Sequence, residues 1–544
     1  MCGSLQNQEI VLERASGILM HPLSLPGDEG AGVLGREAFA FIDWLVSAGQ
    51  KIWQILPLGP TGYGDSPYAS FSVFAGNPYM ISVRTLIEEG DVTKEECEPI
   101  FRIPPGRVEY GTLYQEKNSI LRLAAKRFFA SGDAGQAAAQ DGSALPGAKQ
   151  SKRDLARRKD FESFVEREQE WLQDYALFMT AKIRFAGAPW QEWPAEIRLR
   201  RDAAALSALK KDFEYSVILY AQWQFFRQWH ALRAYAEKRG VTIVGDAPIF
   251  VAADSADVWV DRRFFQLDEN GHALAVAGVP PDYFSPTGQL WGNPLYDWDA
   301  LKNDGYLWWK KRLIRLLRLV HRVRIDHFRG FAQYWAVPAG AATAVTGEWR
   351  DGPGEDFFTE LVRCFGRPLP LIAEDLGFIT PDVFALRDTF GLPGMRIFCF
   401  APWGEASWND ENGVARVLTE HTYAPEMYIP QCIAYPGTHD NDTVVGWFTA
   451  LGAEQRFMVK EYLHARAGYM ITEANVANAV TECLLASKAG TVIFQMQDIL
   501  GLPGEARFNT PGLCDSRNWS WRLPALPDKK TAKWLLQRTK QAGR

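Results

Sequence analysis

Four acidic residues end four separate apolar stretches of the chain, and together they could perform the chemistry of paired carboxyl groups. Asp246, Asp326, Glu374 and Asp440 each follow a short run of mainly aliphatic residues. In such a pair, an ionised carboxylate acts as nucleophile or charge stabiliser while a protonated carboxyl supplies a proton. Taken singly, Asp246 and Asp440 also have a structural interpretation, because Asp near Gly commonly forms turns or caps helices.

Residues 323–330, with the sequence VRIDHFRG, place a cation next to one of these acids. In a β-strand successive side chains point to opposite faces, so Arg324, Asp326 and Phe328 share one face. The same parity predicts that His327 points the other way. A solvated ion pair at a strand end would explain this pattern. Alternatively, Arg324 holds Asp326 in its ionised form, which suits a nucleophile.

Glu374 and Asp375 are adjacent, so a persisting strand would point them in different directions. One of the two is therefore expected to be structural. Glu374 shares the inward parity of Ile372 and Leu376, which favours it as the functional acid.

Other kinds of site lack their sequence signatures. His327 and His439 do not show the ligand spacing of a zinc site. The chain has no Gly-x-Ser-x-Gly elbow, no Walker-type loop and no fingerprint of a redox cofactor. The sequence therefore predicts neither a metal nor an organic cofactor.

Eight strand candidates, most of them separated by helical segments, are needed to position these residues. They are residues 17–20, 51–56, 242–246, 323–330, 369–377, 395–400, 433–442 and 492–498. Alternation of strands and helices predicts parallel βαβ units, and eight of them predict an α/β fold, a closed (β/α)₈ TIM barrel. The structural rival is an open doubly wound sheet, which would favour a glycine-rich phosphate fingerprint after the first strand. In a barrel the site lies at the C-terminal strand ends, where the four acids fall.

The barrel is expected to occupy the whole chain, residues 1–544, as one catalytic unit with large insertions and no C-terminal β-sandwich. Residues 77–238 are predicted to form a mainly helical subdomain, interrupted at 131–151 by a flexible loop rich in Ala, Gly, Ser and Gln. Residues 252–300 are predicted to form a lid and insertion subdomain. Within it, the Pro- and Gly-rich residues 278–294 are interpreted as a long binding loop.

The amino-acid composition restricts the classes of ligand and partner that the chain is expected to bind. A net charge of -6 over 544 residues gives no electrostatic footprint for nucleic acid or an anionic membrane. Aromatic residues make up 13% of the chain, and their rings can stack on sugars or on nucleobases. Because the chain has no excess of Lys and Arg, sugar ligands are favoured. Seven scattered cysteines indicate reduced thiols in a cytoplasmic protein. No apolar run is long enough for a membrane span, and the N-terminus lacks a signal-peptide pattern.

Eight segments in this order resemble the amylomaltases, bacterial 4-α-glucanotransferases of the α-amylase clan, and the resemblance extends from residue 17 to residue 523. The matching segments are residues 63–68, 245–251, 283–296, 323–330, 373–377, 438–442, 497–500 and 506–512. By this resemblance, Asp326 is expected to be the nucleophile, Glu374 the general acid/base and Asp440 the acid that stabilises the distorted sugar.

The resemblance also implies the residues that bind substrate. Those expected around the donor glucose are Tyr68, Asp246, Arg324 and His439, and those expected on the acceptor side are Gln289, Trp291, Asn293 and Asn509. The implied activity transfers α-1,4-glucan segments between maltooligosaccharides, or from starch- or glycogen-derived glucans, through a covalent glycosyl-enzyme. The residues leave two other functions open: a retaining α-1,4-glucan hydrolase and an inactive glycan-binding protein. The oligomeric state cannot be read from the sequence.

Overall fold

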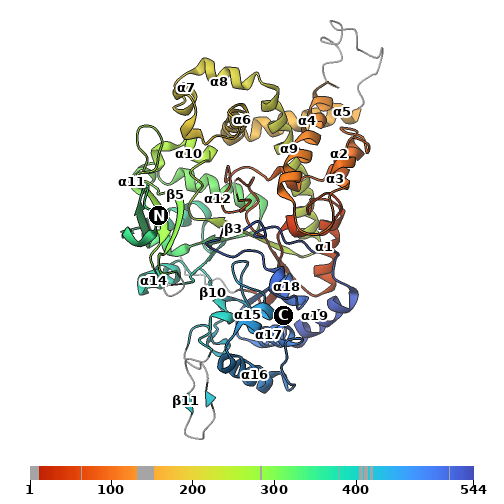
Figure 1. The fold of residues 1–544 in the computed structure, drawn as a ribbon, viewed down its shortest axis with the longest axis vertical. Helices are drawn as coiled ribbons and strands as arrows, with labels where there is room; N and C mark the ends of the chain where they lie inside the picture. Colours follow the sequence, from red (N-terminus) through yellow and green to blue (C-terminus); the bar gives the residue numbers. More distant parts are fainter. Residues whose placement is uncertain are drawn as a thin grey trace, which may run out of the picture.

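Eight parallel strands form one sheet at the centre of the molecule (Figure 1). The computed structural model describes residues 12–62, 64–130, 152–281, 285–377, 379–403, 408–409, 415–416, 421–513 and 515–544. In spatial order the strands are β10 (Gly394–Ile397), β13 (Cys432–Tyr435), β14 (Thr491–Gln495), β1 (Ala15–Leu19), β2 (Ile52–Gln54), β3 (Thr242–Pro248), β6 (Arg322–Asp326) and β9 (Leu371–Ala373). All eight correspond to strands predicted from the sequence.

The two outer strands, β9 and β10, meet and close the sheet. The backbone N–H of Ala373 in β9 donates to the carbonyl of Pro393, just before β10, at 2.9 Å. Beside it, the backbone N–H of Met395 in β10 donates to Asp375 Oδ1 at 2.7 Å. The fold is therefore an α/β barrel, as predicted, rather than the open doubly wound sheet.

Helices connect the strands around the outside of the barrel. They are α1 (Arg36–Ser47), α9 (Phe213–Lys238), α12 (Leu307–Leu319), α13 (Gly354–Phe365), α14 (Pro381–Thr389), α15 (Val444–Ala450), α16 (Ala453–Ala467), α17 (Val476–Ala486), α18 (Met496–Ile499) and α19 (Lys529–Gln541). Helix α1 shows why the sequence folds in this way: Phe41, Ile42 and Leu45 recur on one face and are buried. The ring of Phe41 packs edge-on against Trp53 of β2, with centroids 5.2 Å apart.

Most of the remaining helices come from the chain between β2 and β3 and gather on one side of the barrel (Figure 1). They are α2 (Val83–Glu89), α3 (Glu98–Phe101), α4 (Tyr110–Ala130), α5 (Lys152–Arg167), α6 (Gln169–Arg184), α7 (Ala195–Arg198) and α8 (Ala203–Lys210). The long aromatic helix α9 packs against α4, α6 and β3. The predicted loop at 131–151 lies outside the described residues, and the division into subdomains remains a prediction.

A second sheet corrects the prediction of a long structureless loop at 278–294. Here β4 (Ala275–Val279) and β5 (Gln289–Pro294) form an antiparallel hairpin, which β7 (Gln333–Pro338) and β8 (Glu348–Asp351) extend to four strands in the order β5-β4-β7-β8. Helix α10 (Ala256–Val260) precedes the hairpin in sequence and helix α11 (Trp298–Asn303) follows it. A separate pair of short strands is formed by β11 (Trp408–Asn409) and β12 (Ala415–Arg416). The strands were missed because turn-forming residues lie between β4 and β5, and because β7, the other partner of β4, lies far along the chain.

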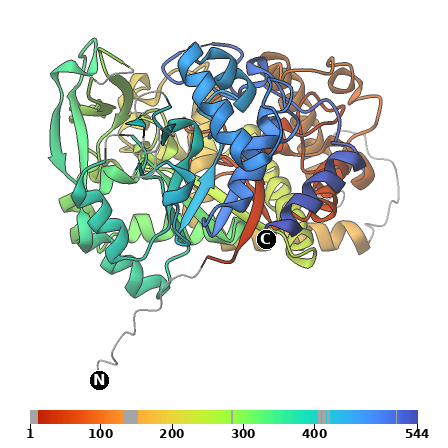
Figure 2. The same cartoon turned by 90° about the horizontal axis from the view of Figure 1, so that it is seen from below.

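The last helix, α19, packs against α1, which brings the two ends of the barrel sequence together (Figure 2). Its first turn is capped by Asp528, whose carboxylate accepts the backbone N–H of Thr531 at 2.8 Å. Beyond it, the buried guanidinium of Arg544 donates to backbone carbonyls that include those of Ala15 and Gly490. Residues 528–544 thus form a capped helix followed by a buried arginine. Within the described part of the chain, none of the helices has the length and apolarity needed to cross a membrane.

The close approach of β1 and β2 gives a testable prediction at Gly17. A Cβ atom added there would lie 2.5 Å from both the Cβ and the carbonyl oxygen of Ile52. We expect Gly17→Ala to lower the free energy of unfolding by about 1–3 kcal/mol, because the strands would have to separate. Chemical denaturation measures the change. Gly111→Ala in α4 is the matched control, since a Cβ there meets nothing within 4 Å, and it should leave stability unchanged or slightly raised.

Candidate active site

A single guanidinium, that of Arg324 in β6, joins two carboxylates at the C-terminal end of the barrel strands. Asp246 in β3 lies directly opposite Arg324 in the strand register. Arg324 Nη1 donates to both oxygens of Asp246, at 2.9 and 2.7 Å, and Nη2 donates to Asp326 Oδ1 at 2.8 Å. The side chains of Arg324 and Asp246 are only 3% and 0% exposed, whereas that of Asp326 is 28% exposed. The solvated ion pair considered from the sequence is therefore wrong, and only Asp326 is open to a ligand.

Tyr68 forms a wall beside this charged cluster. Its hydroxyl donates to Asp246 Oδ2 at 2.8 Å. Its ring stacks on that of His439 with centroids 5.2 Å apart and planes 12° apart, and Trp519 lies 5.8 Å away. Burial and the nearby Asp246 raise the pKa of Tyr68 well above its usual value. The hydroxyl therefore remains a hydrogen-bond donor at neutral pH.

Glu374 follows β9 and is buried next to Asp326. Its Oε2 accepts the backbone N–H of His327 at 2.7 Å, and its Oε1 accepts that of Leu376 at 3.0 Å. Burial raises the pKa of Glu374 to about 8, and the negative charge of Asp326 adds to this, against the opposing effect of Arg324. The carboxyl group consequently holds a proton at neutral pH.

The neighbouring acid, Asp375, has a different environment, although β9 ends at Ala373 and strand alternation therefore applies to neither acid. It forms ion pairs with Arg387 and with Arg396, the second at 3.5 Å, and it accepts the backbone N–H of Met395. Its side chain is fully buried. Asp375 therefore stabilises the junction of β9 and β10.

Strand register sets the separation of Asp326 and Glu374. In the parallel pair β6–β9, Ile325 lies opposite Ala373, and the backbone N–H of Glu374 donates to the carbonyl of Ile325 at 3.1 Å. The next residue on each strand is one of the two acids. Neighbouring strands lie about 4.8 Å apart, which places the backbones of the two acids side by side at the same end of the barrel.

Asp440 and its partners complete the cluster from the loop after β13. His439 Nε2 lies 3.4 Å from Asp440 Oδ2. Asn509 Nδ2 donates to Asp440 Oδ1 at 2.6 Å, and Arg507 Nη2 donates to the Asp440 backbone carbonyl at 2.6 Å. The Asn509 amide thus orients Asp440. The sequence analysis placed Asn509 on the acceptor side and did not predict this contact.

The hairpin β4–β5 places the predicted acceptor-side residues near the end of β6. The exposed ring of Trp291 meets the ring of His327 edge-on, with centroids 4.8 Å apart, and Trp291 Nε1 donates to Gln289 Oε1 at 3.2 Å. Asn293 Nδ2 donates to the carbonyl of Val251 at 2.8 Å, which anchors the hairpin to the segment after β3. Trp291 therefore contacts the turn that follows β6. Tyr63 and residues 282–284 lie outside the described residues.

His327 was placed away from the site by strand parity, and this placement is wrong. Strand β6 ends at Asp326, and His327 adopts a left-handed conformation with φ 55°. The turn directs its backbone N–H to Glu374 and its ring to Trp291. Burial lowers the pKa of His327 to about 4, so the ring is neutral. Alternation applies only inside a strand, and no sequence signal marked the turn.

Trp519 was also missed, because it lies 451 residues from Tyr68 in sequence (519 − 68) and contacts the site only through folding.

Among the residues that the structure describes, no group of three or more His, Cys, Asp or Glu side chains could hold a metal ion. The arrangement is one carboxyl group paired with a buried guanidinium and one protonated carboxyl group at adjacent strand ends, with hydrogen-bonding groups around them. Such a pair can cleave an acetal by displacement with acid assistance.

Comparisons with known proteins identify the family of the chain. The sequence profile of the 4-alpha-glucanotransferases matches residues 20–527. A 4-alpha-glucanotransferase from Thermus thermophilus is 47% identical over 519 residues, which are 94% of this chain and 95% of the relative. A chloroplastic/amyloplastic 4-alpha-glucanotransferase from Solanum tuberosum is 38% identical over 518 residues, covering 94% and 82%. The structure of an amylomaltase from Streptococcus agalactiae in complex with acarbose superposes with a TM-score of 0.86 at 35% identity, covering 98% of this chain and 100% of that one.

The buried cluster predicts a large effect of removing Arg324. Arg324→Met leaves the carboxylate of Asp246 buried without its cation, and we expect the free energy of unfolding to fall by about 3–5 kcal/mol. Adding Asp246→Asn to this variant should recover part of the loss. Urea denaturation measures both changes. Arg36→Met is the control, because the Arg36 side chain is 88% exposed in its pair with Glu37, and a loss there equal to that of Arg324→Met would contradict the prediction.

Proposed function

This chain belongs to glycoside hydrolase family 77, the 4-alpha-glucanotransferases, and on this premise we propose that Asp326 and Glu374 carry out a retaining double displacement. The chain is a 4-alpha-glucanotransferase, and the family acts on α-1,4-glucans. The observation that carries the proposal is the pairing of Asp326, which accepts a hydrogen bond from Arg324, with the protonated Glu374 at adjacent strand ends. Retaining enzymes need their two carboxyl groups about 5–5.5 Å apart, and residues at matching positions on neighbouring strands can approach each other this closely.

In the first step, Asp326 attacks the anomeric carbon of the donor glucose. The glycosidic C–O bond breaks as the Asp326 ester forms, and the Glu374 proton passes to the leaving 4-oxygen. The shorter glucan departs with that proton, so charge and atoms balance. Arg324 supports the ionised form of Asp326 at the start of this step through its hydrogen bond at 2.8 Å.

In the second step, the 4-hydroxyl of an acceptor glucan attacks the ester, and Glu374 takes its proton. Esterification removes the charge of Asp326, which is one of the causes that raise the pKa of Glu374. The pKa of Glu374 therefore falls in the glycosyl-enzyme, which suits its change from acid to base. Asp326 leaves as a carboxylate, and the resting state is restored.

The remaining residues of the cluster are proposed to hold the donor glucose. Asp440 is 40% exposed, and its Oδ2, which Asn509 does not bind and which lies 3.4 Å from His439 Nε2, would accept sugar hydroxyls and stabilise the distorted ring as positive charge develops. Tyr68 and His439 stack into a rigid wall next to it. Arg324 and Asp246 hold this wall in place through the hydroxyl of Tyr68.

The hairpin residues Gln289, Trp291 and Asn293 are proposed to support the acceptor. The ring of Trp291 is partly exposed next to His327, whose backbone contacts Glu374, so a sugar packed on Trp291 would have its hydroxyl near the base. Family membership decides among the three functions left open by the residues, since it favours transfer over hydrolysis or binding alone. We propose maltooligosaccharides and starch- or glycogen-derived glucans as substrates.

We also propose a cytoplasmic location. Cys97, Cys364, Cys399, Cys432 and Cys483 are free thiols in the described part of the chain. Unpaired cysteines fit a reducing compartment.

Incubation with maltotriose tests the proposed reaction. We expect glucose together with a ladder of longer maltooligosaccharides, which chromatography resolves. Asp326→Asn should lower the transfer rate by about 10⁴-fold or more while leaving maltooligosaccharide binding within a few-fold of wild type, because only the nucleophile is lost. Asp299→Asn, on the exposed first turn of α11, is the matched control. Glucose and maltose without a ladder, or near-normal transfer by Asp326→Asn, would contradict the proposal.

The pKa of Glu374 predicts a pH dependence. Because its carboxyl loses the proton above a pKa of about 8, kcat/KM for maltotriose should fall about tenfold per pH unit at higher pH. With α-maltosyl fluoride, whose leaving group needs no proton, this alkaline fall should disappear from the first step.

Glu374→Gln provides the matching variant. It should lose transfer from maltotriose but keep much of the first step with α-maltosyl fluoride, measured as fluoride release. Equal losses with both donors would show that Glu374 does not act as the acid.

A further inference from the structure

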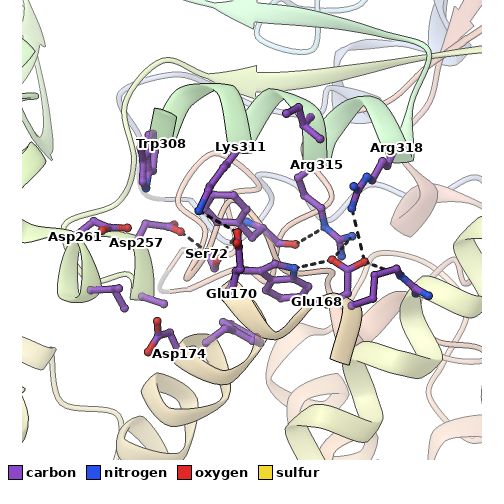
Figure 3. Close-up of a pocket in the computed structure, with 17 residues that line it drawn as sticks. Ser72, Glu168, Glu170, Asp174, Asp257, Asp261, Trp308, Lys311, Arg315 and Arg318 are labelled. Atoms are coloured by element: carbon purple, nitrogen blue, oxygen red, sulfur yellow. Dashed lines mark hydrogen bonds and ion pairs between the residues drawn. The ribbon is translucent and has the colours of Figure 1, made fainter. Parts of the chain in front are cut away.

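The groove between α6 and α12 contains cations that are paired with carboxylates (Figure 3). Arg315 Nη1 lies 3.1 Å from Glu168 Oε2, and the Arg315 guanidinium lies over the ring of Trp171, 4.7 Å from the ring centroid. Lys311 Nζ lies 2.9 Å from Glu170 Oε2. These pairs join α12 to the start of α6, so the charges in this groove have a structural explanation.

Arg507, next to the barrel site, differs because its guanidinium binds the main chain. Its Nη2 donates to the backbone carbonyl of Asp440 at 2.6 Å, and its Nε donates to the backbone carbonyl of Asn509. Among the residues that the structure describes, no carboxylate forms an ion pair with Arg507. Hydrogen bonds from an ionised donor are shorter and about twice as strong as those between neutral groups. Two strong bonds from one cation thus converge on residues of the site.

Arg507, Asp440 and Asn509 form a closed ring of three hydrogen bonds. The third bond runs from Asn509 Nδ2 to Asp440 Oδ1 at 2.6 Å. Each of the three residues therefore contacts both of the others. The guanidinium is planar, and its Nε and Nη2 lie on the same edge, so it holds the two carbonyls at a fixed separation. The ring consequently fixes the backbone of Asp440 together with one oxygen of its carboxylate.

The segment that carries Arg507 is itself anchored on both sides in sequence. Before it, the side-chain amide of Gln497 in α18 donates to the carbonyl of Ala506 at 3.0 Å. After it, the backbone N–H of Trp519 donates to the carbonyl of Phe508 at 2.7 Å. Arg507 thus reaches the loop after β13 from a support outside that loop. A donor held in this way is preorganised before a substrate arrives.

The loop after β13 does not fix the Asp440 carboxylate by its own turn. Within the turn, the backbone N–H of Thr438 donates to Asn441 Oδ1 at 2.8 Å, and that of Asn441 donates to the Thr438 carbonyl at 2.9 Å. Neither bond involves the side chain of Asp440. Its Oδ1 is held by Asn509, and its Oδ2 lies 3.4 Å from His439 Nε2. The direction of the carboxylate therefore depends on the closed ring.

We propose that Arg507 is a positioning residue of the transfer reaction, which holds the Asp440 carboxylate where the distorted donor sugar needs it. The inference rests on the role proposed above for Asp440. Arg507 itself contacts no reacting atom in this scheme. Contacts between the carboxylate and the sugar strengthen as the ring distorts. A displaced carboxylate therefore slows the chemical step more than it weakens binding of the undistorted substrate.

Arg507→Met tests the proposal, because it removes both hydrogen bonds and keeps a side chain of similar length. We expect kcat for maltotriose transfer to fall about 10–100-fold and KM to change by less than about threefold. Arg507→Lys keeps the charge but cannot span both carbonyls, so its kcat should lie between those of Arg507→Met and the wild type. Arg517→Met is the matched control and should leave kcat unchanged, because the Arg517 side chain is 74% exposed in its pair with Asp515.

A double-mutant cycle with Asp440→Ala separates positioning from a merely structural role. Fluoride release from α-maltosyl fluoride is the readout, because an activated donor keeps slow variants measurable. In the Asp440→Ala background, Arg507→Met should lower the rate by less than about twofold, since no carboxylate remains to be positioned. An equal fall in both backgrounds would overturn the proposal, as would a kcat of Arg507→Met close to that of the wild type. If Arg507→Met does not fold, Arg507→Lys enters the same cycle.

Asp440→Ala alone tests the role on which the inference rests. We expect it to lower the rate of fluoride release at least about 100-fold, because an oriented charge that stabilises the transition state is lost. Near-normal release by Asp440→Ala would count against the proposed role of Asp440 and remove the reason for positioning it. A strong loss in Asp440→Ala without any effect of Arg507→Met would overturn the positioning role alone and leave the proposed function intact.

Discussion

The buried contact between Arg324 and the carboxylates of Asp246 and Asp326 is the interaction on which the site depends. Arg324 lies within a central strand and is almost fully buried, so its charge is tolerated only because Asp246 opposes it across the β3–β6 register. The same guanidinium then orients Asp326 at the end of its strand. Tyr68 joins the cluster by donating to Asp246, and its ring positions His439. One buried cation therefore links residues from four separate parts of the chain.

The barrel gives Asp326 and Glu374 opposite environments although they are neighbours. Asp326 faces the guanidinium and is partly open to solvent. Glu374 is buried, and the loss of hydration outweighs the hydrogen bonds from His327 and Leu376, which keeps it protonated. The two acids are neighbours because β6 and β9 are adjacent and parallel. Their environments differ because different chain segments follow the two strands. The adjacent Asp375 is held by Arg387 and Arg396 at the strand junction, where a catalytic role is sterically closed.

Most of the barrel could be predicted from the sequence, because buried parallel strands are local runs of apolar residues with polar ends. All eight strands, and the long helices α9 and α12, have such local signals. The hairpin β4–β5 was missed because it is stabilised by β7, roughly sixty residues later, and its own sequence is rich in turn formers. His327 was misplaced because strand alternation was extended one residue beyond the last residue of β6. Both errors have the same physical origin, since long-range pairing and strand ends are not encoded in local periodicity.

The sequence by itself determined the parallel barrel, the end of the barrel at which the acids lie and, through family resemblance, which acids to consider. These features depend on residue type and alternation, which are local. Only the tertiary structure decided that Arg324 is shared between two carboxylates, that Asn509 holds Asp440, and that Trp291 and Trp519 border the site. The raised pKa of Glu374 also arises there, because exclusion of water depends on every chain segment that packs around the carboxyl group. Burial and long-range contact are properties of the closed barrel, and no single stretch of the chain contains them.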